Sequence, residues 1–297
     1  MPSATMRLKW LLRTALGAHG YERLVFRHHL GYWPDLKNPT SFCEKIAYRK
    51  LYYTDARYVA LSDKVAVRSY VAEKWGDDIL TTLFGIMSPG DNLPPDLPPM
   101  FFIKAAYGSG INHRVTDFTS GRRAEILRLA DGMLRREHVY GRLSNQWWYE
   151  RIPKRLMFEE VLIDSRHGVP LDFKFYCFHG KVHLVQIDFN RFEQHTRSYF
   201  DRDWNFLPYT SVYPQGPAIS RPPNLEQMIN VAEVLSEDLD FVRVDLYDVD
   251  DTRIVFGEMT FAPEAGWVVF SPTQEPDWEA GRLWTLATHE PPRTMGQ

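Results

Sequence analysis

Residues 241–266, FVRVDLYDVDDTRIVFGEMTFAPEAG, contain two short runs in which apolar residues alternate with others. Such alternation is typical of β-strands with one buried face, and the intervening aspartates are typical of a turn. The stretch therefore predicts a β-hairpin. It also places charge at core-like positions: Arg243 and Asp245 in the first strand, Glu258 in the second. A core cannot hold such charges unpaired, so they either form a structural ion-pair network or line a cleft that binds something charged.

Two further stretches combine a strand pattern with charge. Asp172 and Lys174 lie two residues apart in LDFKFYCF and therefore share one face of an expected strand. Glu159 and Glu160 are consecutive in LMFEEVL, so one of them must point inward from a strand that is otherwise apolar. Acids and bases thus alternate on faces that ought to pack, which favours the cleft.

A glycine-rich turn follows the expected strand in MFFIKAAYGSGINHRV. Lys104 ends the strand, and Gly108, Ser109 and Gly110 form the turn. Glycines let backbone N–H groups approach an anion closely, and a lysine adds a point charge beside them, so this segment is a candidate phosphate grip. The alternative is an ordinary strand lysine before a flexible turn, because neither GxxxxGK[ST] nor GxGxxG is present.

Composition excludes several classes of protein. A chain of 297 residues with 44% hydrophobic side chains can bury a sizeable core. A formal charge of −3 gives no general attraction to nucleic acid, so we expect no nucleic-acid partner. Cys43 and Cys177 are far apart and form no CxxC motif, which argues against disulfides and thiolate metal sites. We therefore expect a cytoplasmic protein.

Residues 6–27, which begin MRLKWLLRTALG, form an expected amphipathic helix. Its apolar stripe consists of Leu8, Leu11, Leu12, Ala15 and Leu16, and its basic residues are Arg7, Lys9 and Arg13. The stripe either docks on the protein's own domain or makes a peripheral contact with the inner face of a membrane. No apolar run reaches the roughly 20 residues needed to span a bilayer.

Elsewhere helices and strands alternate without a repeated βαβ unit, which predicts an α+β fold. Ser41 and Glu44 form a capping box at the start of one helix, and residues 62–76 form another. Five prolines within residues 88–100 forbid regular structure there. A hairpin is expected around His179 and Gly180, a turn-favouring pair between two alternating runs.

The order of these motifs resembles the TupA-like group of the ATP-grasp superfamily. The blocks NPTSFCEKI, LSDKVAVRSYV, DFKFYCFHGK and FGEMTFAPEAG carry the resemblance, which covers about residues 38–266. It implies an ATP-grasp fold, in which two α+β lobes bind ATP between them, together with a helical N-terminal segment. The expected division is a helical region over 1–76, a small lobe with the glycine-rich loop over 77–162, and a large lobe with the metal site over 163–297.

The resemblance also implies which residues bind the nucleotide. Lys64 and Lys104 would bind ATP phosphates, and a loop over residues 107–112, with Gly108, Ser109 and Gly110, would close over them. Glu159, together with the backbone from Glu160 to Leu162, would hold the adenine. Asp172 would hold the ribose hydroxyls.

The implied metal site lies in the opening hairpin. Asp245 and Glu258 would bind one or two Mg²⁺ ions, because this hard cation prefers carboxylate and phosphate oxygens. Thr260 stands where many of these ligases carry asparagine, so its hydroxyl would be a weak ligand, would be replaced by water, or would leave one metal site incomplete. Arg243 would stabilise the transferring phosphoryl group or the tetrahedral intermediate, with Lys174 as a second catalytic cation.

The implied activity is that of an ATP-dependent carboxylate–amine ligase acting through an acyl phosphate. Its substrates would be small-molecule or glycan acids and amines from the biosynthesis of a surface polysaccharide or peptide polymer. Two alternatives stay open. Asp248 and Asp250 form a D-x-D motif, which in many glycosyltransferases binds a metal and a nucleotide sugar, although it falls in an expected turn. The other is a nucleotide-binding module without catalysis, or an ATP-dependent kinase of a sugar or lipid acceptor.

Overall fold

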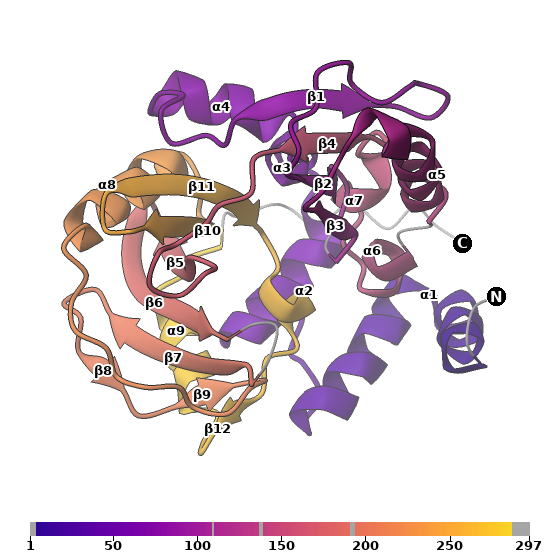
Figure 1. Ribbon diagram of the computed structural model, residues 1–297. Coiled ribbons are helices and arrows are strands. Elements are labelled where there is room, and N and C mark those ends of the chain that lie inside the picture. The colour runs from indigo at the N-terminus through magenta and orange to yellow at the C-terminus, as the bar shows by residue number, and fades with distance from the viewer. Residues whose placement is uncertain (1–3, 109, 137–138, 191–193, 287–297) are drawn as a thin grey trace.

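Two antiparallel sheets carry the centre of the molecule, as Figure 1 shows. The computed structural model describes residues 4–108, 110–136, 139–190 and 194–286. The smaller sheet has the order β1-β4-β2-β3, with β1 (Leu83–Met87), β2 (Phe101–Ala105), β3 (Asn112–Val115) and β4 (Leu156–Glu159). The larger has the order β11-β10-β5-β6-β7-β8, with β5 (Leu171–Phe178), β6 (Lys181–Phe189), β7 (Thr196–Asp201), β8 (Phe206–Leu207), β10 (Phe241–Val249) and β11 (Arg253–Thr260). The α+β prediction is confirmed.

The larger sheet has one apolar and one charged face. Phe173, Phe175 and Cys177 of β5 are buried on the side where helix α8 (Leu225–Ser236) packs, and the Cys177 thiol donates to the carbonyl of Ala232 in that helix. Asp172 and Lys174 of β5 and Arg243 and Asp245 of β10 lie on the opposite face. In β5 and β10, the alternation seen in the sequence thus separates a face that packs in the core from a face that carries the ion-paired side chains.

The smaller sheet is divided in the same way. Phe101 and Ile103 of β2 belong to a second apolar core with helix α5 (Arg123–Leu134), whereas Lys104 belongs to the other face. Leu156 and Phe158 in β4 join this core. The remaining faces of the two sheets border a common cavity, which locates the candidate site.

Helices surround the sheets. Those before the smaller sheet are α1 (Ala4–Leu30), α2 (Phe42–Tyr52), α3 (Arg57–Ser62) and α4 (Val67–Lys74). The short helices α6 (Val139–Leu143) and α7 (Trp148–Arg151) precede β4, and α9 (Glu275–Arg282) follows a small two-stranded sheet of β9 (Thr210–Ser211) and β12 (Phe270–Ser271). Among the described helices, none is long and apolar enough to cross a membrane. The predicted division at residues 76 and 162 stays a prediction.

The start of α2 confirms the predicted capping box. The Ser41 side chain accepts from the backbone N–H of Glu44, and the Glu44 carboxylate accepts from the backbone N–H of Ser41. The residues that hold this helix come from the far end of the chain. The Cys43 backbone N–H donates to Asp277 at 2.8 Å, and the Arg49 guanidinium donates to the carbonyl of Phe241 at 2.9 Å.

The expected helix over residues 62–76 is divided in two. α3 ends at Ser62, and α4 begins at Val67 after a turn that the Asp63 side chain caps by accepting from two backbone N–H groups. The backbone N–H of Lys64 donates to the carbonyl of Ala106 at 3.1 Å. The helix is interrupted because this turn is bound to the segment that carries the glycine-rich loop.

Both predicted hairpins are confirmed. β5 and β6 are joined by His179 and Gly180, whose φ angles of 50° and 74° suit a tight turn. β10 and β11 are joined through Asp250 and Asp251, also with positive φ. Asp250 accepts from the Ser165 backbone and hydroxyl at 2.8 and 2.5 Å, so these aspartates have the structural role expected of a turn.

Candidate active site

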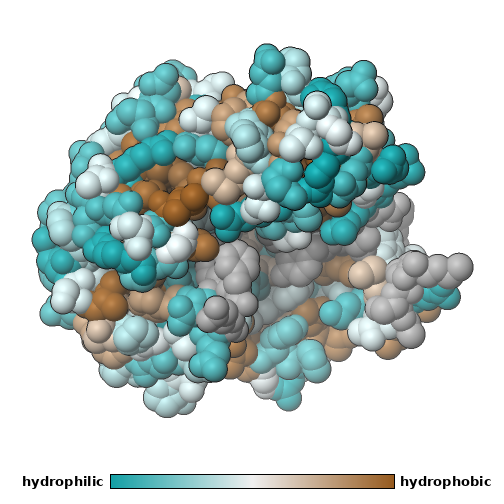
Figure 2. Space-filling model, viewed as in Figure 1, coloured by the Kyte–Doolittle hydropathy of each residue, from teal (hydrophilic) through white to brown (hydrophobic). Residues whose placement is uncertain are grey.

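A cavity of about 160 Å³ lies between the two sheets. Its polar lining comes from α4 and the turn before it, from the segment before β1 and from both sheets: Lys64, Arg68, Thr81, Lys104, Glu159, Asp172, Lys174, Asp245 and Glu258. An adjoining, more apolar cavity of about 480 Å³ is lined by Phe102, Val161, Leu162, Val169, Pro170 and Phe256, among others. Figure 2 shows apolar side chains gathered in a recess over β10 and β11. The two cavities share several wall residues and together form one polar and one apolar compartment.

Asp245 is the centre of the charged face. Its two carboxylate oxygens accept from Arg243 at 2.7 and 2.7 Å, and one also accepts from Lys174 at 2.8 Å. Lys174 stands opposite Asp245 in the register of β5 and β10 and donates to Asp172 at 2.6 Å. All four side chains are buried. The charged residues of the hairpin at residues 241–266 thus form an ion-pair network with Lys174, and Asp245 and Glu258 also line a cavity. The sequence had offered the network and the cleft as alternatives, and the structure has both an ion-pair network and a cavity.

Burial and neighbouring charge act against each other here. Burial lowers the pKa of Lys174, but Asp172 and Asp245 outweigh it, so the pKa lies above its ordinary value and the amine stays charged. Burial raises the pKa of Asp245, while Arg243 and Lys174 oppose that shift. The guanidinium of Arg243 is held in one orientation by its two bonds to Asp245, which suits it to bind an anion at a fixed place.

Glu258 reaches the cavity through a β-bulge. It stands opposite Asp245, and the register shifts directly afterwards so that Gly257 is the extra residue. A Cβ on Gly257 would lie 3.0 Å from the carbonyl oxygen of Asp245, so glycine allows the strands to approach. The Glu258 carboxylate lies 3.3 Å from Lys64 and 3.6 Å from Arg243. Bulges of this kind re-aim a side chain next to a functional site.

Three cations keep Glu258 ionised. Burial alone would raise its pKa, but Lys64, Arg243 and Lys174 outweigh burial and lower the pKa to about 2. Thr260, the departure from the family pattern, donates to Glu258 at 3.2 Å and accepts from Arg243 at 3.2 Å. Its hydroxyl is therefore hydrogen-bonded to one carboxylate, that of Glu258, and to Arg243, which binds the other carboxylate, that of Asp245.

The glycine-rich segment is tied to this cluster by Lys64. The Lys64 ammonium donates to the carbonyl of Gly108 at 2.8 Å. Gly108 and Gly110 line the cavity and have φ angles of 73° and 76°, which glycine adopts without steric cost. Ser109, the third predicted residue of this loop, lies outside the described residues. The described part of this loop thus borders the cavity, and its closing over phosphates stays a prediction.

The two glutamates from the segment predicted to hold the adenine, Glu159 and Glu160, each form an ion pair. Glu159 is the inward-pointing member of the consecutive glutamates: it is 3% exposed, forms an ion pair with Lys104 and accepts from Thr81 at 2.6 Å. Glu160 binds Arg253 at 2.6 Å, which, with the bond from the Thr82 backbone, lowers its pKa despite partial burial. Leu162 lines the apolar cavity.

Sequence reasoning missed two sets of polar residues near the cavity. Arg68 lines it and donates to the Thr81 carbonyl at 2.7 Å. Asp188 and Arg197 continue the charged face across β6 and β7, because Asp172, Asp188 and Arg197 stand opposite one another in register. The spacing of Gln186 and Asp188 in VHLVQIDF was a visible signal, since it repeats the two-residue step of Asp172 and Lys174.

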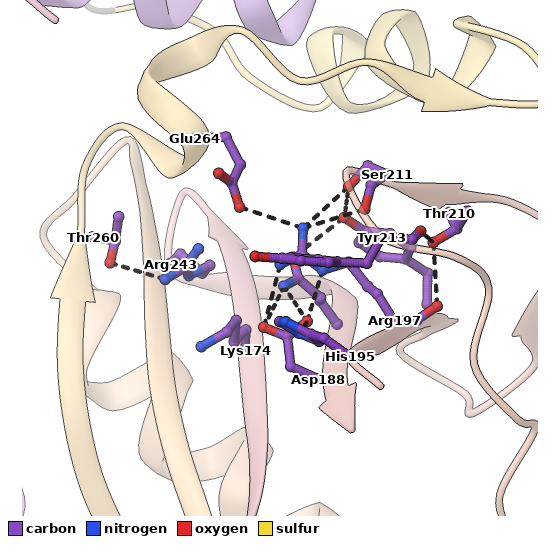
Figure 3. Close-up of polar contacts among 12 residues, drawn as sticks. Lys174, Asp188, His195, Arg197, Thr210, Ser211, Tyr213, Arg243, Thr260 and Glu264 are labelled. Carbon is purple, nitrogen blue, oxygen red and sulfur yellow. Dashed lines mark hydrogen bonds and ion pairs between the residues drawn. The ribbon is translucent and has the colours of Figure 1, made fainter. Parts of the chain in front are cut away.

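Figure 3 shows how this second cluster is built. Arg197 donates to Asp188 at 2.7 Å, lies 3.4 Å from Glu264, and faces the ring of Tyr213 at 4.9 Å. The ring of His195 stacks on the ring of Tyr213, with the two ring centres 3.5 Å apart. Burial raises the pKa of Asp188, but Arg197 outweighs it, and the net shift is downward. Charged groups therefore extend along the sheet well beyond Lys174.

The residues present fit a magnesium–nucleotide site. Within the described residues, no group of three or more histidine, cysteine or acidic side chains forms a metal cage. Asp245 and Glu258, in register, offer two carboxylates beside several cations. Mg²⁺ is bound in this way in many phosphate-handling proteins, through one or two carboxylates, substrate phosphates and water.

The family model for TupA-like ATP-grasp proteins matches residues 44–283. The chain therefore belongs to the TupA-like ATP-grasp family, as the ordered motifs implied. Members of the ATP-grasp family are mostly ATP-dependent ligases that use ATP and Mg²⁺. A comparison with individually curated proteins finds no match.

Solved structures of ligases are distant likenesses. The D-alanine–D-alanine ligase from Bacillus anthracis, complexed with ATP, is 13% identical with a TM-score of 0.42, and the match covers 68% of this chain and 55% of that chain. The enzyme of that name from Coxiella burnetii is 14% identical with a TM-score of 0.45, covering 82% and 60%. The D-Ala:D-Ser ligase from Enterococcus faecalis is 11% identical with a TM-score of 0.41, covering 75% and 57%. The chain thus spans between 55% and 60% of the length of these ligases.

Proposed function

We propose that the protein is an ATP-dependent carboxylate–amine ligase that forms an amide through an acyl phosphate. One observation supports this most directly: Asp245 and Glu258 stand in register at the wall of a cavity and are surrounded by Arg243, Lys174 and Lys64. Carboxylates suited to Mg²⁺ beside fixed cations are what the transfer of a charged phosphoryl group needs.

The two compartments suggest how the nucleotide lies. The apolar cavity lined by Leu162 and Phe256 has the chemistry for a purine ring, and the polar cavity has cations for phosphates. Lys64 and Lys104 would bind the phosphates, with the Gly108 segment above them. Asp172 was expected to hold the ribose hydroxyls, but it also binds Lys174, so its role is partly to position that lysine.

The proposed reaction has two steps. A carboxylate oxygen of the acceptor attacks the γ-phosphorus, and the bond to the ADP oxygen breaks. The amine nitrogen then attacks the acyl carbon, phosphate leaves, and the nitrogen gives up a proton. Arg243, fixed by Asp245, would stabilise the charge that develops in these steps, and Lys174 would assist. Bound Mg²⁺ would neutralise phosphate charge beside Asp245 and Glu258, with Thr260 as a weaker oxygen.

The acceptor would lie along the polar face that leads from Lys174 to Asp188 and Arg197. The proposed acceptors are an acid and an amine from the biosynthesis of a surface polysaccharide or peptide polymer. The test is ADP release against a matrix of uronic acids, amino acids and amines. Dependence on both an acid and an amine is expected. ADP release with a hydroxyl acceptor alone, leaving phosphate on it, would establish a kinase instead.

Nucleotide binding is tested separately by thermal unfolding. Mg-ATP at about 100 times its dissociation constant should stabilise the protein by about 2.7 kcal/mol, whereas Mn²⁺ with a UDP-sugar should not. Stabilisation by the UDP-sugar alone would reject the proposal. The D-x-D motif gives the glycosyltransferase alternative little support, because Asp248 accepts from Asn224 beside α8 and lies three residues from Asp245, on the other face of β10.

The metal ligands are tested by Asp245→Asn and Glu258→Gln. Each should reduce ATP turnover by at least about 100-fold and leave the fold intact, because one oxygen ligand is lost from a two-carboxylate site. Asp251→Asn is the matched control: it removes a turn carboxylate of the same hairpin, paired with Arg166, and should leave turnover unchanged. Full activity in Asp245→Asn would mean that the metal site lies elsewhere.

A further inference from the structure

The first part of α1 exposes an apolar stripe instead of burying it. Leu8, Leu11 and Leu16 are 56%, 68% and 45% exposed, and Ala15 between them is exposed as well. With 100° between successive helical residues, these side chains fall on one side of the helix. Of the five residues of the predicted stripe, only Leu12 is half-buried, so most of the stripe is not covered by the described part of the protein. Several exposed leucines on one helix face mark an interaction surface more often than isolated ones do.

The helix contacts the rest of the protein with its opposite side. Trp10, Arg13 and Thr14 line a groove that Arg142 and Trp147 border on the other side. The Arg142 guanidinium lies 5.1 Å from the centre of the Trp10 ring. Because the tryptophan side holds the helix on the body, the leucine side is the side left for a partner.

The positive charge beside the leucines indicates a negatively charged partner. Arg7 and Lys9 are exposed and flank the leucines on either side. The first 21 residues contain three of the 35 lysines and arginines and none of the 38 acidic residues. The other residues therefore carry 32 basic and 38 acidic side chains, a formal charge of −6. An anionic surface would attract the helix and repel the body, which would orient the molecule.

A break at Gly17 separates the first part of α1 from the part that is anchored in the protein. Gly17 interrupts α1 with φ 65° and ψ −178°, and nothing lies within 4 Å of the place where its Cβ would be. After this break the helix is anchored, because Glu22 and Lys50 form a fully buried ion pair at 2.7 Å. Figure 1 shows the first part of α1 at the edge of the molecule, away from both sheets.

We propose that residues 4–16 lie in the interface of an anionic lipid bilayer. The side chains of Leu8, Leu11 and Leu16 enter the acyl boundary, and Arg7 and Lys9 reach the headgroups with their long stems along the helix. Exposed leucines flanked by basic side chains on one helix are the pattern of helices that lie in a lipid interface, and the test below separates this partner from a second copy of the chain. This surface lies on α1, outside the cavity between the sheets, and its occupancy does not depend on the proposed ligase activity.

The test is flotation of the full-length protein with two kinds of vesicle. One contains phosphatidylcholine only, and the other contains about 30% phosphatidylserine. Binding is expected only to the anionic vesicles and should weaken as salt is added, because added ions screen the headgroups. Lys9→Gln should weaken binding by about five-fold, the value for one basic residue near such a surface.

The leucines are tested by the double variant Leu8→Gln with Leu11→Gln. It should bind anionic vesicles at least about ten-fold more weakly, since each buried leucine contributes strongly to insertion. Leu283→Gln is the matched control, because this leucine is 39% exposed at the end of α9. Equal binding by the double variant and the wild type, or no binding of wild type to anionic vesicles, would overturn the proposal. So would a wild-type dimer in sedimentation that the double variant abolishes.

Discussion

Glu258 shows how a single residue depends on its surroundings. Its carboxylate is 34% exposed, yet its pKa is lowered to about 2 because Lys64, Arg243 and Lys174 outweigh the effect of burial. An ordinary glutamate is half protonated at pH 4.5. This one keeps its negative charge in more acidic solution, down toward pH 2.

This shift predicts a pH dependence of stability. Because the folded pKa is depressed, the stabilising contribution of Glu258 is complete above pH 4.5 and is lost as the pH falls toward 2. Between about pH 6 and about pH 3.5, Glu258→Gln should therefore lose less unfolding free energy than the wild type. Urea unfolding at the two pH values measures the difference. Glu279→Gln, which removes an exposed carboxylate of α9, should follow the wild type.

Residues two apart on one strand could be predicted, and residues on different strands could not. Asp172 with Lys174, and Arg243 with Asp245, share a face because a strand alternates, which any short stretch of sequence reveals. The pairing of Lys104 with Glu159 depends on the register of β2 against β4, and no local pattern contains that register. For the same reason the Asp188–Arg197 cluster escaped notice.

At the scale of elements, α9 packs closely against the start of α2. A Cβ on Gly281 would lie 2.2 Å from the carbonyl oxygen of Thr40 and 2.8 Å from the Cα of Ser41. These are backbone atoms, so they cannot move aside as a flexible side chain would. The capping box of α2 and the end of α9 thus exclude any larger residue at this position.

Gly281→Ala should accordingly destabilise the protein by about 1–3 kcal/mol through overpacking. Gly132→Ala is a matched helical control, because nothing lies within 4 Å of its Cβ position in α5. That change should stabilise by about 0.5–1 kcal/mol, the usual gain from alanine inside a helix. Chemical denaturation of the two variants measures both changes in the free energy of unfolding. Equal effects of the two would show that the close approach does not constrain the fold.

Elements with a strong local pattern were predictable, and their interruptions were not. Both hairpins and the capped α2 follow from alternation, turn residues and the Ser41–Glu44 pair. The division of the 62–76 segment was missed because it comes from a tertiary hydrogen bond, that of Lys64 with Ala106. A helical pattern contains no information about such a bond.

At the scale of the whole molecule, Arg49 joins regions from opposite ends of the sequence. Its side chain is fully buried, forms an ion pair with Asp240 and donates to the carbonyls of Phe241 and Phe261 at 2.9 and 3.2 Å. The guanidinium also lies 4.3 Å from the centre of the Trp284 ring. Helix α2 is thus bound to the strand that leads into the candidate site.

Arg49→Ala should lower the free energy of unfolding by about 3 kcal/mol, because the partly buried Asp240 carboxylate loses its charged partner and the carbonyls of Phe241 and Phe261 lose a donor. Arg57→Ala is the control. Its pair with Asp55 is exposed, with 55% of the arginine side chain accessible, so removing it should cost no more than about 1 kcal/mol. Urea unfolding of both variants measures the contrast, and similar losses in the two would contradict the role given to Arg49.

Helix α2 contacts Asp240, Phe241 and Trp284 through Arg49, and all three residues are synthesised long after the helix. The ribosome completes this helix of 11 residues long before its partners exist, and a helix that short is marginal on its own in water. At about 5–20 residues per second, the wait lasts on the order of tens of seconds. Until then the apolar side of α2 is exposed to whatever surrounds the nascent chain, so the yield of folded protein should depend on chaperones that cover it.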